Sequence, residues 1–301
     1  MMRRSIFTFL QNFHHLSSTP SLLLLPFAVS TLLSPPLTAS SYLFPLVHGR
    51  LRSLFLAAGI PPQSELFAVL NLKLSQTILS FIFSLPFTLS FLLLAKAAII
   101  RLLHHHHHDR DLFSWIKTLN RLLITQICSS LLILSANATC FCLLAISFNI
   151  SDVLGLSSPR FQLLVSATGA IIYSIVLANA YIICSLGMIA SAAEGCSGFS
   201  SILKAVVVIR GRTSTALSLA VPVNMALAAV EALFQYRVVR AYNRAMRLDS
   251  PMVFESILVA YLYAMILVLD TVVGYVFLKS CRAECQNIYH HSESKDFESV
   301  L

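Results

Sequence analysis

Charged side chains are scarce in this chain, and one long stretch has none. Asp, Glu, Lys and Arg make up 11% of its 301 residues, whereas a soluble domain carries about 25%. Residues 161–193 contain no Asp, Glu, Lys, Arg or His. A helix crosses the hydrocarbon core of a bilayer with about 20 apolar residues, so this stretch predicts a transmembrane helix. The composition excludes a soluble domain of useful size.

Paired cysteines and catalytic motifs are also missing. The seven cysteines have neither the paired spacing of a zinc site nor the framework of a small disulfide-rich domain. No Gly-x-Ser-x-Gly, phosphate-binding glycine loop, His-Glu-x-x-His or Cys-x-x-Cys pattern occurs. We therefore expect no enzyme, no cofactor and no metal site.

Apolar stretches divide the chain into six predicted spans. The first is rich in proline, which disrupts helical hydrogen bonding unless neighbouring helices compensate; we expect it to be an uncleaved helix. The predicted fold class is all-α, a polytopic transmembrane helix bundle with short interfacial helices. Its parts are an N-terminal segment (1–15), a transmembrane domain (16–285) with spans at about 21–47, 74–103, 122–150, 161–193, 213–234 and 254–278, and a disordered tail (286–301).

Basic residues predict how these spans are oriented. The two terminal segments and the connections on their side hold 13 Lys and Arg, while the alternate connections hold 8. The positive-inside rule then places both termini in the cytosol, and it suits the endoplasmic reticulum and the plasma membrane equally. We assign the net charge of +8 to topology and lipid headgroups, and expect no nucleic acid partner.

Two connecting segments have the pattern of helices lying on the membrane surface. Asp111 can cap a helix that carries Trp115, the only tryptophan, at headgroup level. In the second segment, four arginines recur at intervals of three and four residues and form one basic stripe on a helix. They are Arg237, Arg240, Arg244 and Arg247. The stripe either meets anionic headgroups or is a solvated extension of the fifth span.

Asp270 is the one carboxylate deep inside a predicted span. An ionisable group in lipid is costly and must face other helices or water. With Glu231 and Asn224 of the preceding span it forms a predicted intramembrane polar site. This site is either a proton or cation relay, or a structural contact that fixes helix pairing. Lys96 lies near the end of its span and can extend its stem to the interface.

Histidines and juxtamembrane cysteines are the other reactive groups. His104 to His108 form a run of five, which favours a low-complexity loop over a metal site because no histidine lies within the core of a span. Cys281 and Cys285 follow the last span on the predicted cytosolic side, where cysteines can be palmitoylated. Unmodified cysteines are the alternative interpretation.

The segment after the charge-free stretch has the most distinctive pattern. Glu194 closes a helix, Gly198 permits a turn into a short amphipathic stretch with Lys204, and Arg210-Gly211 leads into the next span. This pattern resembles a family of plant multi-pass membrane proteins without an assigned function, in which a terminal glutamate is followed by Gly-Phe, a basic residue and a Lys/Arg-Gly turn.

The same resemblance extends to the end of the last span. The segment from Asp270 to Cys281 looks like the family's last helix with its basic-Cys exit, whereas Ala205 departs from the usual serine. The likeness covers about 160–285. A more distant similarity is to the helical membrane domain attached to some bacterial glycerophosphodiester phosphodiesterases, whose catalytic domain is absent here.

Two functions fit these observations. Residue pairs of small side chains four apart, such as Gly187 with Ser191, favour close helix packing and suit a scaffold or partner of other membrane proteins, or self-association. The alternative is a transporter or channel that uses Asp270.

Overall fold

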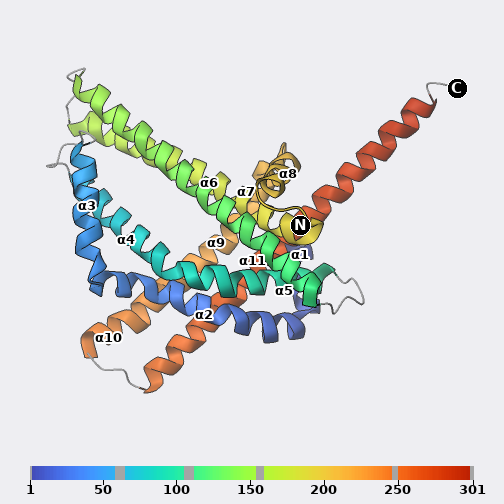
Figure 1. The fold of residues 1–301 in the computed structure, drawn as a ribbon, viewed down its shortest axis with the longest axis horizontal. Coiled ribbons are helices and arrows are strands. Elements are labelled where there is room, and N and C mark those ends of the chain that lie inside the picture. Colours follow the sequence, from blue (N-terminus) through green and yellow to red (C-terminus); the bar gives the residue numbers. More distant parts are fainter. Residues whose placement is uncertain (1, 58–64, 105–111, 154–158, 246–249, 299–301) are drawn as a thin grey trace.

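The computed structural model describes residues 2–57, 65–104, 112–153, 159–245 and 250–298, and these residues form helices joined by short turns, without a strand. Figure 1 shows their arrangement. The elements are α1 (Met2–Gln11), α2 (Phe13–Ser40), α3 (Leu43–Ala57), α4 (Glu65–Phe87), η1 (Thr88–Leu92), α5 (Leu93–His104), α6 (Leu112–Val153), α7 (Pro159–Glu194), α8 (Phe199–Ile209), α9 (Thr213–Phe234), η2 (Gln235–Val239), α10 (Arg240–Ala245) and α11 (Ser250–Glu298).

Six helical segments are long and apolar enough to cross a membrane, which confirms the predicted all-α polytopic bundle. They are Phe13–Thr38, Asn71–Leu103, Trp115–Leu144, Leu163–Glu194, Thr213–Tyr242 and Ser250–Ala283. The second span joins α4 to α5 through the π-helical turn η1, and the fifth joins α9 to α10 through η2.

The proline-rich first span is a helix, but it ends earlier than predicted. α2 stops at Ser40, Ser41 is extended, and α3 begins at Leu43. Pro45 explains the break, because a proline ring clashes with the carbonyl four residues earlier, here that of Ser41, if the helix continues. In the first turn of α3, by contrast, its missing N–H costs nothing.

Side chains replace hydrogen bonds that the prolines of α2 remove. Pro20 leaves the Leu16 carbonyl without its helical donor, and the hydroxyl of Ser21 donates to that carbonyl at 3.0 Å. Pro35 does the same to Thr31, whose carbonyl accepts from Ser34 at 2.8 Å. A proline inside a membrane helix is tolerated when its freed carbonyl finds such a partner.

α11 lies at the centre of the bundle. It packs against α2, α5, α7 and α9, and its buried residues Val268 and Val272 belong to a core shared with Leu24 and Leu32 of α2. A second core joins α11 to α7, α8 and α9. In contrast, α6 and the first part of α7 extend side by side away from this centre (Figure 1).

Two predicted segments differ from the structure, and a third follows one of its two predicted alternatives. Residues 112–121 are not a surface helix but the start of the 42-residue α6, which contains no Gly or Pro to stop it. The arginine stripe is an extension of α9 through η2 and α10, with Arg247 outside the described residues. The tail is helical to Glu298 rather than disordered, since a helix already nucleated propagates easily through residues without Gly or Pro.

Candidate functional site

The turn after α7 is built on glycines. α7 ends at Glu194, and Gly195 and Gly198 have positive φ angles of 74° and 64°. α8 then begins at Phe199, and Gly211, with a φ angle of 85°, leads into α9. L-residues with side chains rarely adopt such angles, so glycine permits both reversals. This confirms the predicted order of elements: a helix end, a short helix and a glycine turn.

A buried chain of hydrogen bonds fixes this turn against α6. The backbone N–H of Gly198 donates to the hydroxyl of Thr125 at 2.9 Å, and Ser191 of α7 donates to the carbonyl of Cys196 at 2.9 Å. The hydroxyl of Thr125 donates to Ser191 at 2.9 Å and also lies 2.8 Å from the Arg121 carbonyl of its own helix, so its single proton is shared between these two acceptors. Thr125 and Ser191 are fully buried, and a paired polar chain of this kind defines one arrangement of the backbone.

Close contact between α7 and α8 also holds the turn in place. The buried Ser201 hydroxyl donates to the carbonyl of Gly187. A Cβ atom at Gly187 would lie 3.2 Å from the Cα atom of Ile202. Gly187 therefore allows α8 to lie directly on α7, as its predicted role in close helix packing requires.

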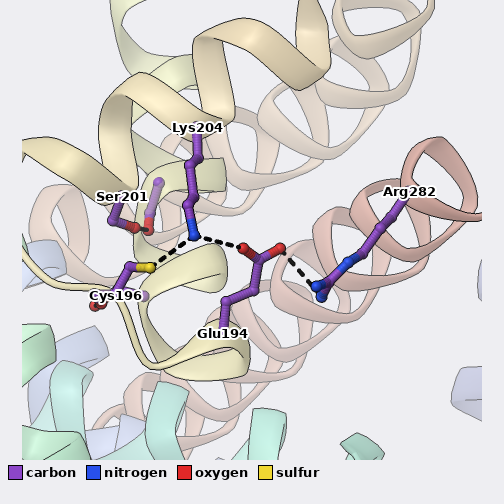
Figure 2. Close-up of polar contacts among 7 residues, drawn as sticks. Glu194, Cys196, Ser201, Lys204 and Arg282 are labelled. Atoms are coloured by element: carbon purple, nitrogen blue, oxygen red, sulfur yellow. Dashed lines mark hydrogen bonds and ion pairs between the residues drawn. The ribbon is translucent and has the colours of Figure 1, made fainter. Parts of the chain in front are cut away.

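Glu194 holds a cation on each side (Figure 2). One carboxylate oxygen lies 3.5 Å from the Nζ of Lys204 on α8, and the other lies 3.3 Å from the Nη1 of Arg282 on α11. The Glu194 side chain is 14% exposed, while those of Lys204 and Arg282 are 49% and 59% exposed. The carboxylate thus lies beneath two cations that face outward, and the three charges join α7, α8 and α11.

Lys204 has a second partner in the turn. Its Nζ lies 2.7 Å from the Sγ of Cys196 (Figure 2). This hydrogen bond, together with the charge of Glu194, raises the pKa of Lys204 above its usual range. Lys204 therefore stays cationic throughout the physiological pH range.

A groove of about 610 Å³ opens beside these charges. Its walls are apolar and come from α7, α8 and α11, while its charged edge is made of Glu194, Lys204 and Arg282. The apolar walls include Ala190, Leu203, Val207, Val208 and Leu278. We call this the α8 groove. Its volume lies within the 300–1,000 Å³ typical of ligand sites.

Sequence reasoning identified part of this junction. It found Glu194, Gly198, Lys204 and Gly211, whereas Arg210 is exposed and ends α8. It missed Arg282 as the second partner of Glu194. One signal was available, because α7 and α11 are the fourth and sixth spans, so they leave the membrane on the same side.

The predicted polar site around Asp270 is not assembled as the sequence suggested. Asn224 is exposed and donates to the Ala220 carbonyl of its own helix at 2.9 Å. The charge of Glu231 interacts with Tyr263, and Tyr263 lies two helical turns from Asp270 along α11. Neither lines the cavity of about 40 Å³ beside Asp270.

Asp270 has other neighbours instead. Tyr181 of α7 lines the same small cavity, and Lys96 of α5 is the cation whose charge acts on the Asp270 carboxyl. Lys96 is half-buried and faces the bundle rather than extending to the interface. The sequence placed both charges in spans but gave no sign that α5 and α11 are neighbours.

The remaining predicted groups lie away from any assembled site. Cys281 is buried, 3.9 Å from Arg212, on a face of α11 that packs against the bundle, which favours the alternative of an unmodified cysteine. The side chain of Cys285 and residues 105–108 of the histidine run lie outside the described residues. Within the described part of the chain, no three His, Cys, Asp or Glu side chains gather as metal ligands.

Comparison with known proteins identifies a family but no activity. No curated protein and no solved structure matches the chain significantly. The resemblance to plant proteins and to the bacterial phosphodiesterase membrane domain stays a prediction. Residues 4–299 match a family described as a domain of unknown function, DUF8558, and the chain belongs to that family.

Proposed function

We propose that this multi-pass membrane protein is a non-enzymatic scaffold that binds transmembrane helices of other membrane proteins through α6. The observation that carries the proposal is how little of α6 the bundle covers. Only 6% of the most apolar part of its span is buried, against 44% for the span of α7. A helix that contributes so little to its own bundle presents most of its surface to other molecules in the bilayer.

One exposed side of α6 is suited to close helix contact. Small residues follow one another along it: Ser135, Ala138, Thr139 and Cys142. The hydroxyls of Ser135 and Thr139 donate to carbonyls of their own helix, at 2.9 Å and 3.0 Å. This side therefore needs no polar partner, and its small side chains let another helix approach closely.

Photo-cross-linking within the membrane tests this proposal. A photoreactive residue at Ala138 is compared with one at Ile172 of α7, which is also exposed and lies at a similar depth, because the neighbouring Tyr173 donates to Asn137 of α6 at 2.6 Å. We expect Ala138 to give cross-links to protein and Ile172 to give cross-links to lipid. If both positions react with lipid alone, α6 is a lipid-facing helix and the scaffold proposal fails.

The interior charges support a second candidate, a transporter or channel. Tyr181 of α7 and Asp270 of α11 line a small cavity, and the charge of Lys96 on α5 acts on the Asp270 carboxyl. Intramembrane charges often mark ion pathways. Flux of protons or cations into vesicles containing the purified protein tests it. We expect Asp270→Asn to abolish flux in a transporter and to leave the cross-links of a scaffold unchanged.

We also propose that both termini face the cytosol, on the strength of the uneven distribution of basic residues. Tags at the two ends should both be accessible to protease on the cytosolic side of sealed vesicles. Protection of either tag would contradict this orientation.

A further inference from the structure

The α8 groove is polar at one end and apolar deeper in the membrane. Glu194 and Arg282 lie at the ends of their spans, and Ala190 and Leu278 lie one helical turn deeper on the same two helices. Both pairs line the groove. The groove therefore runs from the charged border of the bilayer into its hydrocarbon region.

The outer side of α8 also faces an apolar medium. Phe199, Leu203 and Val207 are 61%, 50% and 67% exposed, while Ile202 and Ala205 are buried against the bundle. A short helix that is apolar on its outer side beside the end of a span suits the bilayer interface. The groove is therefore open to lipid.

The charged edge of the groove has an excess of positive charge. One carboxylate serves two cations, so the edge carries one net positive charge. The Arg282 guanidinium has five N–H donors and Lys204 has three, of which the Glu194 ion pairs and the Cys196 contact use only some. Because Glu194 lies beneath them, the remaining donors face outward.

We propose that the α8 groove binds one anionic phospholipid. Its phosphate contacts Lys204 and Arg282, and one acyl chain lies along Ala190, Val207 and Leu278. Charge complementarity selects an anionic lipid, since a zwitterionic headgroup brings its own cation to an edge that is already positive. The inference is independent of the scaffold proposal.

Native mass spectrometry of the full-length protein in detergent measures lipid retention directly. The probes are phosphatidylglycerol and phosphatidylcholine, titrated separately. We expect one phosphatidylglycerol to be retained in preference to phosphatidylcholine, and millimolar inorganic phosphate not to displace it. Displacement by phosphate, or equal retention of the two lipids, would overturn the proposal.

Charge variants should change phosphatidylglycerol affinity in opposite directions, whereas loss of a merely structural contact would lower the affinity in every variant. Lys204→Gln and Arg282→Gln should each weaken phosphatidylglycerol binding about five-fold, as expected for one cation near an anionic headgroup. Glu194→Gln removes the competing carboxylate and should tighten it. Arg210→Gln is the matched control, because Arg210 is exposed and does not line the groove.

A steric variant tests the acyl chain. Val207→Trp should fill the groove from an exposed position and weaken binding of both lipids. Weaker binding in Glu194→Gln, an equal loss in Arg210→Gln, or no effect of Val207→Trp would each contradict the proposed site. Circular dichroism and gel filtration establish that each variant is folded.

Discussion

Replacing Thr125 by valine should loosen the turn between α7 and α8 and destabilise the protein. Valine keeps the shape of the side chain but removes the hydroxyl that accepts from Gly198 at 2.9 Å and donates to Ser191 at 2.9 Å. The Gly198 N–H is then left unpaired in a buried site, while Ser191 keeps its bond to the Cys196 carbonyl and loses the one from Thr125. An unsatisfied buried polar group costs about 1–3 kcal/mol, so we expect a loss of that order.

Two quantities are measured: the free energy of unfolding in detergent or bicelles, and the rate of hydrogen exchange at the Gly198 amide. Thr139→Val is the matched control on the same helix: its hydroxyl is exposed and bonds only its own helix, to the Ala136 carbonyl at 3.0 Å. We expect the control to change stability by less than about 0.5 kcal/mol. Exchange at Gly198 should accelerate only in Thr125→Val.

A double variant separates the hydrogen-bond chain from simple loss of packing. If the chain acts as a unit, Thr125→Val and Ser191→Ala should cost less together than the sum of the two single losses. Equal effects of Thr125→Val and Thr139→Val, with unchanged exchange at Gly198, would refute the role assigned to this chain.

Three further changes test other parts of the structure. Ser21→Ala should cost about 1 kcal/mol in unfolding free energy, because it leaves the Leu16 carbonyl freed by Pro20 unpaired; an unchanged stability would contradict this. Gly198→Ala should lower the unfolding free energy by about 1–3 kcal/mol, because Gly198 has a positive φ. The loss should be larger than in Gly211→Ala, because of the two new Cβ atoms only the one at Gly198 would meet a neighbour, Ile124 at 3.2 Å. The contribution of Lys204 to stability should be fully present below its usual pKa of 10.5 and be lost at higher pH, because its folded pKa is raised. The measurement is the unfolding free energy as a function of pH in the wild type and in Lys204→Gln. A stabilisation by Lys204 that is already lost below pH 9 would contradict this prediction.

Hydropathy predicted where the chain crosses the membrane, but not where its helices end. The six spans follow from the energetic cost of placing charge and unpaired backbone in lipid, which the sequence displays directly. A helix ends, however, where Gly, Pro or a turn stops it, and not where the membrane stops. α11 is apolar to Ala283 yet helical to Glu298, and α6 likewise begins before its apolar part.

The α8 junction was predictable where the signal is local. Glycines at a turn and a glutamate at the end of an apolar run are features of neighbouring residues, and Gly195 carries the same signal. Partners distant in sequence were predictable at most to one side of the membrane, as for Glu194 and Arg282 at the ends of the fourth and sixth spans. Nothing near Glu194 indicates Arg282, and nothing near Asp270 indicates Lys96, because both pairings depend on which helices pack together.

Those partners matter because apolar burial does little to choose neighbours inside a bilayer. Lipid tails are as apolar as leucine, so hydrophobic side chains gain little by leaving lipid for another helix, and polar contacts and close packing decide which helices pair. The described residues show such a contact at several helix pairs: Ser80 of α4 with Ser34 of α2 at 2.6 Å, Thr125 of α6 with Ser191 of α7, Glu194 of α7 with Arg282 of α11, and Arg237 of η2 with Glu255 of α11 at 2.7 Å. Removing these contacts should therefore leave all six spans inserted while changing which of them are neighbours. In this protein, the few polar residues carry the information that a large apolar core carries in a soluble protein.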